Sequence, residues 1–166
     1  MFPRYSHSHD LTRVVVTEPG GLFVGIGPAV EGRQNDQYTA NHSGLNNHLH
    51  NADLKALADR GFSNSTNVAA FLKQNQVNPY SRFEITALSA IRTVGIELPF
   101  GQLQTAFPLL VSKWKNKIFQ TCPDIWFHAA AIISNCIRLE NGCNNNTYFG
   151  VLPNFTVERY LAGETN

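Results

Sequence analysis

Residues 12–26 read TRVVVTEPGGLFVGI, with two strand-like runs on either side of a turn sequence. The run from Thr12 to Thr17 is strongly β-branched, and the run from Leu22 to Ile26 is apolar, as expected for paired strands. Between them lies EPGG (18–21), and proline followed by glycine is typical of a tight turn. This stretch therefore predicts a β-hairpin.

The chain after the hairpin alternates between loop, helix and strand signals. A loop-like segment, EGRQND (31–36), ends in two residues that favour helix N-caps. We expect a short helix from about residue 37 to residue 49, weakened by the HSG at 42–44. The apolar run LKALA (54–58) then predicts a brief strand. The DRG at 59–61 ends it, because glycine can take a positive φ.

A helical pattern with an interruption spans about residues 81–107. Apolar residues recur at spacings of three, three and four, as on one face of a helix: Leu88, Ile91, Val94 and Leu98. Pro99 lies inside this pattern and has no N–H to donate to the carbonyl of Gly95. The sequence therefore predicts a helix with a kink or break near Gly95.

The clearest helix runs from Asp124 to Leu139. Its apolar residues share one face: Ile125, Ala129, Ile132, Cys136 and Leu139. Gly142 follows where a helix would stop, and residues 144–166 read as an irregular polar tail. We therefore expect one α/β domain over residues 1–143 and a tail over residues 144–166.

Composition and charge narrow the possible classes. The chain has 166 residues, is 43% hydrophobic and 15% charged, and carries a formal charge of +1. A free-standing DNA binder of this size usually shows a clear basic excess, so we expect contact with DNA to rest on local patches or on a further part of the protein. The sequence has no run of about 18 apolar residues, so we expect no membrane span. Three cysteines without a CxxC spacing favour a reducing, intracellular compartment over a disulfide framework or zinc site.

Two carboxylates stand out by position. Asp59 follows the short apolar strand, and Glu97 lies beside the apolar stripe of the helix. Strand ends are where α/β sheets place their chemistry, and Mg²⁺ prefers hard oxygen ligands. On the residues alone, we favour a turn aspartate before glycine and a solvated helix glutamate over a metal site.

Several segments, in order along the chain, match one family. They are VVVTEPGGLF (14–23), GPAVEGRQND (27–36), SGL (43–45), ALADRGF (56–62), LSAIRTVGIELPFGQLQTAFP (88–108) and IISNCI (132–137). From Tyr5 to about Gly142 the chain resembles the DDE superfamily endonuclease domain of Harbinger-like transposases. The second segment resembles the family's GP..GR.HD, and the fifth resembles SS.R..VE..FG.LK.RFP.

This resemblance implies a fold, a chemistry and a site. It implies an α/β, RNase H-like nuclease fold that binds DNA and cleaves phosphodiesters with Mg²⁺ or Mn²⁺. It points to Asp59 as the second catalytic aspartate and to Glu97 as the catalytic glutamate, both metal ligands. The family of transposable-element proteins further implies the nucleus or cytoplasm, without a membrane.

The chain also departs from the family's pattern. The family's first aspartate lies upstream of the segment that Tyr5, His7 and His9 match. We therefore expect a truncated domain without the first central strand, and a nuclease that is weak or inactive. Gln104 and Thr105 stand where the family often has lysine and another polar or basic residue, which weakens a contact with the DNA backbone.

A second hypothesis belongs to a different class. The chain would be a non-catalytic interaction protein whose exposed sheet edge pairs with a second copy, a full-length transposase or another partner. Metal dependence separates the two hypotheses, because only the enzyme predicts Mn²⁺ binding that needs Glu97.

Further residues have two interpretations each. Asp36 either assists the site or, as we favour, caps the following helix. Arg92 either contacts DNA or, as we favour, fixes Glu97. Lys113, Lys115 and Lys117 alternate around Trp114, which suits either phosphate contacts with base stacking or a solvated surface, and we favour the surface.

Overall fold

The structure is a computed structural model, and it describes residues 11–32, 34–58, 60–62, 67–70, 86, 89–110, 123–142, 144–150 and 156–164. The chain divides into two compact units. Unit 1 comprises Met1–Val14 and Gly27–Asn75, and unit 2 comprises Val15–Ile26 and Gln76–Asn166.

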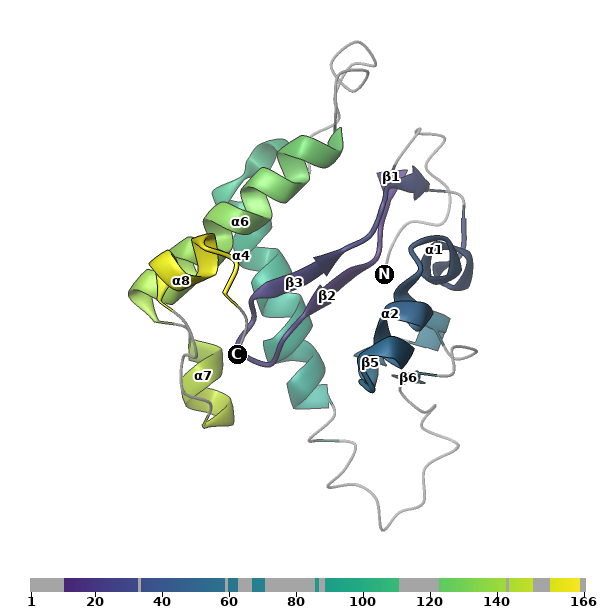
Figure 1. The fold of residues 1–166 in the computed structure, drawn as a ribbon, viewed down its shortest axis with the longest axis horizontal. Coiled ribbons are helices and arrows are strands. Elements are labelled where there is room, and N and C mark those ends of the chain that lie inside the picture. The colour runs from purple at the N-terminus through teal and green to yellow at the C-terminus, as the bar shows by residue number, and fades with distance from the viewer. Residues whose placement is uncertain are drawn as a thin grey trace. The chain divides into compact units, whose positions relative to one another are not determined.

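Unit 1 combines two pairs of short strands with two short helices (Figure 1). In the first pair, β1 (Leu11–Thr12) is antiparallel to β4 (Val30–Glu31). In the second, β5 (Ala56–Ala58) is parallel to β6 (Val68–Ala70), with Ala56 opposite Val68. The predicted strand at 54–58 is thus confirmed over its last three residues, whereas its partner β6 was not predicted.

The helical stretch of unit 1 is two helices instead of the single one predicted. Helix α1 spans Asp36–His42 and α2 spans Leu45–Asn51. Gly44 between them has φ 69°, a left-handed conformation that glycine adopts without strain. The signal that weakened the predicted helix therefore divides it. A 3₁₀ turn, η1 (Arg60–Phe62), follows β5 and contacts α1.

The predicted hairpin is confirmed in unit 2, although its first strand begins at Val15 and not at Thr12, which lies in β1. Strand β2 (Val15–Thr17) pairs antiparallel with β3 (Phe23–Ile26), with Val15 opposite Ile26. Two backbone hydrogen bonds close the turn, from Gly21 N to Glu18 O at 2.8 Å and from Glu18 N to Leu22 O at 3.0 Å. Gly21 has φ 86°, so the turn requires a residue that tolerates this conformation.

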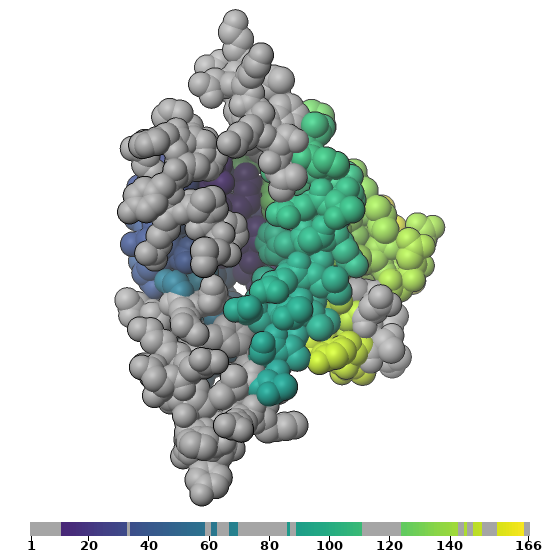
Figure 2. Space-filling view, turned by 180° about the vertical axis from the view of Figure 1, so that it is seen from behind, coloured from purple at the N-terminus to yellow at the C-terminus, as the bar shows by residue number. Residues whose placement is uncertain are grey.

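In the residues of unit 2 that the structure describes, the elements other than the hairpin are helices and helical turns. A π-helical turn, η4 (Thr93–Glu97), leads directly into α4 (Leu98–Ala106), and a 3₁₀ turn, η5 (Pro108–Leu110), follows. Helix α6 (Pro123–Asn141) contacts β3 and α4 (Figure 1). On the face drawn in Figure 2, the teal helix of residues 89–106 lies open to view along much of its length.

The core of unit 2 forms between the hairpin, α4 and α6. Four buried residues make this cluster: Phe23, Leu103, Ala130 and Ala131. Leu103 is only 1% exposed, and the rings of Phe23 and Phe100 meet edge to face with centroids 5.5 Å apart, a favourable aromatic geometry.

The buried face of α6 is not the apolar face predicted. Ile125 is 65% exposed and Ile132 is 45% exposed, whereas Asn135 and Arg138 are buried. The side of α6 toward β3 carries small and polar side chains, and Asn135 forms hydrogen bonds there. Hydropathy selects the wrong face because it does not register polar groups that find buried partners.

Residues 144–166 are not an irregular tail where the structure describes them. They contain α7 (Asn144–Phe149) and α8 (Val157–Leu161). The side chain of Thr156 caps α8 by accepting from Arg159 N, as N-cap threonines commonly do. The Tyr160 hydroxyl of α8 accepts a 2.8 Å hydrogen bond from Asn135 of α6, so α8 packs against α6 within unit 2.

Mixed helices and small sheets are compatible with an α/β nuclease-like domain. None of the helices that the structure describes has the length and apolar character of a membrane span.

Candidate functional site

Glu97 is the last residue of the π-helical turn η4. The predicted irregularity near Gly95 is present, but the helix continues through it instead of breaking. Leu98 N donates to Thr93 O five residues back, one residue further than in an α-helix. Such π-turns inside α-helices are rare in proteins, and many of those that occur lie at functional sites.

Pro99 explains why this turn leaves two carbonyls in need of donors. Proline has no N–H, so it cannot bond to Gly95 O in the α-register or to Val94 O in the π-register. Side chains from other elements take its place. Asn145 Nδ2 in α7 donates to Val94 O at 2.6 Å, and Thr17 Oγ1 in β2 donates to Gly95 O at 2.7 Å.

The Glu97 carboxylate forms an ion pair with Arg92. Arg92 Nη2 lies 3.0 Å from Glu97 Oε1, and the two side chains are 41% and 53% exposed. The two residues are five positions apart, the spacing of the π-helical hydrogen bond, so both side chains emerge on the same side of the helix. An ion pair this exposed adds little stability, but it limits the directions that the carboxylate takes.

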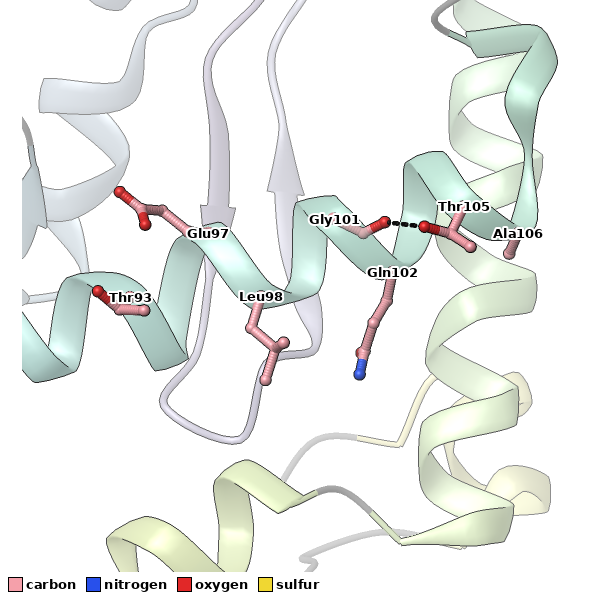
Figure 3. Close-up of a pocket in the computed structure, with 7 residues that line it drawn as sticks. All are labelled: Thr93, Glu97, Leu98, Gly101, Gln102, Thr105 and Ala106. Atoms are coloured by element: carbon pink, nitrogen blue, oxygen red, sulfur yellow. Dashed lines mark hydrogen bonds between the residues drawn. The ribbon is translucent and has the colours of Figure 1, made fainter. Parts of the chain in front are cut away.

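Glu97 also lines a shallow, open groove along this helix (Figure 3). The described residues of its lining are Thr93, Glu97, Leu98, Gly101, Gln102, Thr105 and Ala106. Figure 3 shows Leu98 and Gln102 projecting on the same side of the helix and Glu97 on another. Because the carboxylate is half exposed beside an open groove, an ion or a phosphate can reach it from solvent.

Asp36 does not cap α1, contrary to our interpretation of the sequence. The preceding residue, Asn35, is the cap, and its side-chain oxygen accepts from Tyr38 N at 2.7 Å. The carboxyl group of Asp36 lies instead against Gly61 in η1, where a Cβ on Gly61 would come within 2.7 Å of Asp36 Cγ. Gly61, two positions after Asp59 in the sequence, therefore leaves room for the Asp36 side chain.

The other predicted site residues lie outside the described residues: Asp59, Lys113, Lys115 and Lys117. Within the described ranges, no group of three His, Cys, Asp or Glu side chains could hold a metal ion. The donor chemistry of Glu97 suits a hard divalent cation, and its exposure leaves the carboxylate accessible. One carboxylate does not complete such a site, so further ligands have to come from elsewhere.

Comparison with known proteins identifies the family. A family model described as DDE superfamily endonuclease matches residues 1–138. The chain belongs to this family. No curated protein and no solved structure matches it.

Membership in the DDE superfamily endonucleases agrees with a transposase-derived nuclease that acts on DNA, in a superfamily that generally uses divalent metals. The matched region covers both Asp59 and Glu97 and ends within α6.

Sequence reasoning missed the residues that support Glu97. Asn145 lies in a run of three asparagines at 144–146, and nothing in that run distinguishes the middle one. Thr17 was recognised only as a strand residue. The available signal was Pro99, which requires substitute donors for the carbonyls before it, although it does not say which residues provide them.

Proposed function

We propose that this chain is a transposase-derived, Harbinger-like endonuclease domain that uses Asp59 and Glu97 to bind a divalent metal and cleave DNA phosphodiesters. The observation that carries the proposal is the π-turn that presents an exposed Glu97 inside the segment resembling the family's glutamate motif. Family membership over residues 1–138 supports the assignment of both carboxylates.

The chemistry follows from the residue types. Bound divalent ions stabilise the charge on a phosphodiester and activate water as a nucleophile. Asp59 and Glu97 would supply carboxylate oxygens to Mg²⁺ or Mn²⁺, the ligands these ions prefer. Arg92 would hold the Glu97 carboxylate in one direction before binding, through the 3.0 Å ion pair.

Asp36 would act on the Asp59 segment. Its carboxyl group lies against Gly61, so it would position the backbone that follows Asp59. The predicted effect of Asp36→Asn is a weaker Mn²⁺ affinity than in wild type and a milder loss than in Asp59→Asn.

The test is Mn²⁺ binding, measured by electron paramagnetic resonance, together with plasmid nicking in Mg²⁺ or Mn²⁺. The polypeptide of 166 residues is compared with Asp59→Asn and Glu97→Gln. Each variant removes a charge without changing size, and we expect each to weaken Mn²⁺ binding at least about tenfold. Nicking, even where weak, should fall in parallel.

Two controls remove the same charges elsewhere. Asp53→Asn changes an exposed aspartate of unit 1 at φ 52°, a conformation that asparagine tolerates. Glu140→Gln changes an exposed glutamate of α6. Both should bind Mn²⁺ as wild type does. Equal Mn²⁺ affinity in wild type and in both site variants would refute the proposal.

One observation favours a second candidate function, pairing through a strand edge. Asn135 bonds to both the N–H and the carbonyl of Phe23 on β3, while in the described part of the chain β2 pairs only with β3. The outer edge of β2 would then accept a strand from a second copy, a full-length transposase or another protein. Light scattering on wild type and Glu97→Gln tests the first of these, because pairing through β2 should be identical in both.

A further inference from the structure

In the π-turn before α4, a donor from another helix bonds to a carbonyl oxygen that the helix backbone leaves without its usual donor. In an ordinary α-helix, Leu98 N would donate to Val94 O four residues back. Asn145 Nδ2 occupies Val94 O at 2.6 Å, and Leu98 N donates to Thr93 O instead. The asparagine thus supplies Val94 O with the donor that it lacks in the π-register and removes the cost of leaving this carbonyl unbonded.

Thr17 satisfies the other carbonyl that the turn exposes. Its hydroxyl donates to Gly95 O at 2.7 Å, the acceptor to which Pro99 in the α-register offers no N–H. A buried carbonyl without a donor destabilises the folded state. Thr17 therefore makes the proline at position 99 tolerable in a continuing helix.

Asn145 is placed for this role and for little else. It is fully buried, and its Oδ1 has no hydrogen-bond partner among the described residues. Gly21 leaves space for the amide, since a Cβ there would lie 2.7 Å from Asn145 Nδ2 and 3.2 Å from Pro99 Cγ. The N–H donor, not the amide oxygen, is thus what the fold uses.

We propose that Asn145 and Thr17 are positioning residues that keep η4 in the π-register and so set the direction of Glu97. This inference rests on the proposed role of Glu97 as a metal ligand. If Leu98 N returned to Val94 O, the turn would tighten by one residue. Glu97 would then rotate by roughly a quarter turn about the helix axis relative to the preceding helix, and its pairing with Arg92 five positions back would be lost.

The register can be measured without metal. Scalar couplings across hydrogen bonds, detected by NMR, show whether Leu98 N–H is bonded to Thr93 or to Val94. We expect Thr93 in wild type and Val94 in Asn145→Leu, which removes the donor at similar volume. Thr17→Val keeps the β-branched shape but removes the hydroxyl, so it should lose protection of the η4 amides against hydrogen exchange. Thr17→Ser should keep wild-type protection because serine keeps the hydroxyl.

Matched controls make the same changes at exposed places in unit 2. Thr156→Val removes an exposed hydroxyl that accepts from Arg159 N at 3.4 Å at the start of α8, which is a local bond at a helix end outside the groove beside Glu97. Asn141→Leu changes an exposed asparagine at the end of α6. Neither should alter the acceptor of Leu98 N–H.

Mn²⁺ affinity measures the consequence for Glu97. We expect the dissociation constant to rise about tenfold in Asn145→Leu and to rise in Thr17→Val, with wild-type values in Thr17→Ser and both controls. In the Glu97→Gln background, Asn145→Leu should add nothing, because the two residues then act through one ligand.

The outcomes separate the inference from the proposed function. An unchanged acceptor for Leu98 N–H in Asn145→Leu, or unchanged protection of η4 in Thr17→Val, would overturn the inference whatever the metal does. A changed register with wild-type Mn²⁺ affinity, while Glu97→Gln loses binding, would overturn the positioning role alone. Wild-type affinity in Glu97→Gln would overturn the proposed function and, with it, the claim that the turn serves a ligand.

Discussion

The side-chain hydrogen bonds that shape α1 in unit 1 join residues that are close in sequence, whereas those that support the π-turn and β3 in unit 2 join residues far apart. Asn35 accepts from Tyr38 three positions away, and the bond from Asn67 to Asn46 in the same unit spans 21 positions. In unit 2, the bonds of Thr17, Asn145 and Asn135 to backbone span 78, 51 and 112 positions.

This difference assigns distinct roles to local and distant contacts. The helices of unit 1 are defined by caps and a left-handed glycine, which act within a few residues. The π-turn that carries Glu97 depends on donors that arrive only when unit 2 is folded. Substitutions at the distant contacts should therefore cost more than substitutions at the local ones.

Gly21→Ala should have the largest effect. The residue has φ 86°, and its new Cβ would lie 2.7 Å from both Arg138 Nη1 and Asn145 Nδ2. We expect the left-handed conformation to cost about 1–2 kcal/mol and the crowding to add about 1–3 kcal/mol. Denaturant unfolding measures the total loss of stability. Gly150→Ala, at φ 64° with no atom of the described residues within 4 Å of the new Cβ, should show only the first cost. Equal losses of unfolding free energy in the two variants would show that the close approach at Gly21 does not contribute to the stability of unit 2.

Asn135→Leu comes next. It would leave the N–H and carbonyl of Phe23 and the hydroxyl of Tyr160 without their present partner, at about 2–4 kcal/mol in total. Tyr160→Phe removes only one of these bonds and should cost about 1 kcal/mol. Calorimetric melting compares the two, and a loss in Asn135→Leu no larger than in Tyr160→Phe would show that the contact with β3 is dispensable.

Asn35→Ala examines the local kind of contact in unit 1. Loss of the cap should destabilise α1 by about 1 kcal/mol and speed amide hydrogen exchange at residues 36–39 without changing η4. Asn47→Ala, at an exposed position of α2, is the control and should leave exchange in α1 unchanged. Faster exchange at η4 in Asn35→Ala would contradict the local character of this bond.

Glu18→Gln should have the smallest effect and a distinct pH dependence. Burial raises the pKa of the Glu18 carboxyl, so the folded state holds this proton more tightly than the unfolded state does. Its contribution to stability is present below the unfolded-state pKa and is lost as the pH rises through the folded-state pKa. As the pH rises through the folded-state pKa, the stability of Glu18→Gln should therefore increase relative to that of wild type, by no more than about 0.5 kcal/mol. Denaturation midpoints measured across the rise test this, and parallel profiles would contradict it.

The sequence predicted the parts of the fold whose signals are local. The TRVVVT and LFVGI runs with their EPGG turn specified the hairpin, and Pro99 marked the irregular turn that ends at Glu97. The HSG at 42–44 weakened the predicted helix at the place where α1 and α2 divide, although a single helix was predicted. The ordered motifs also indicated the DDE superfamily endonucleases. Each of these signals depends on residues within a short window, which a sequence displays directly.

Tertiary structure decided the rest. It made the irregularity at Pro99 a π-turn, because Asn145 and Thr17 supply donors to Val94 O and Gly95 O. It buried the polar side of α6 in place of its isoleucine-rich side, because Asn135 finds the backbone of β3. A hydrogen bond between residues 51 to 112 positions apart leaves no periodic or local trace in the sequence. Only the folded chain brings the donor and the acceptor together.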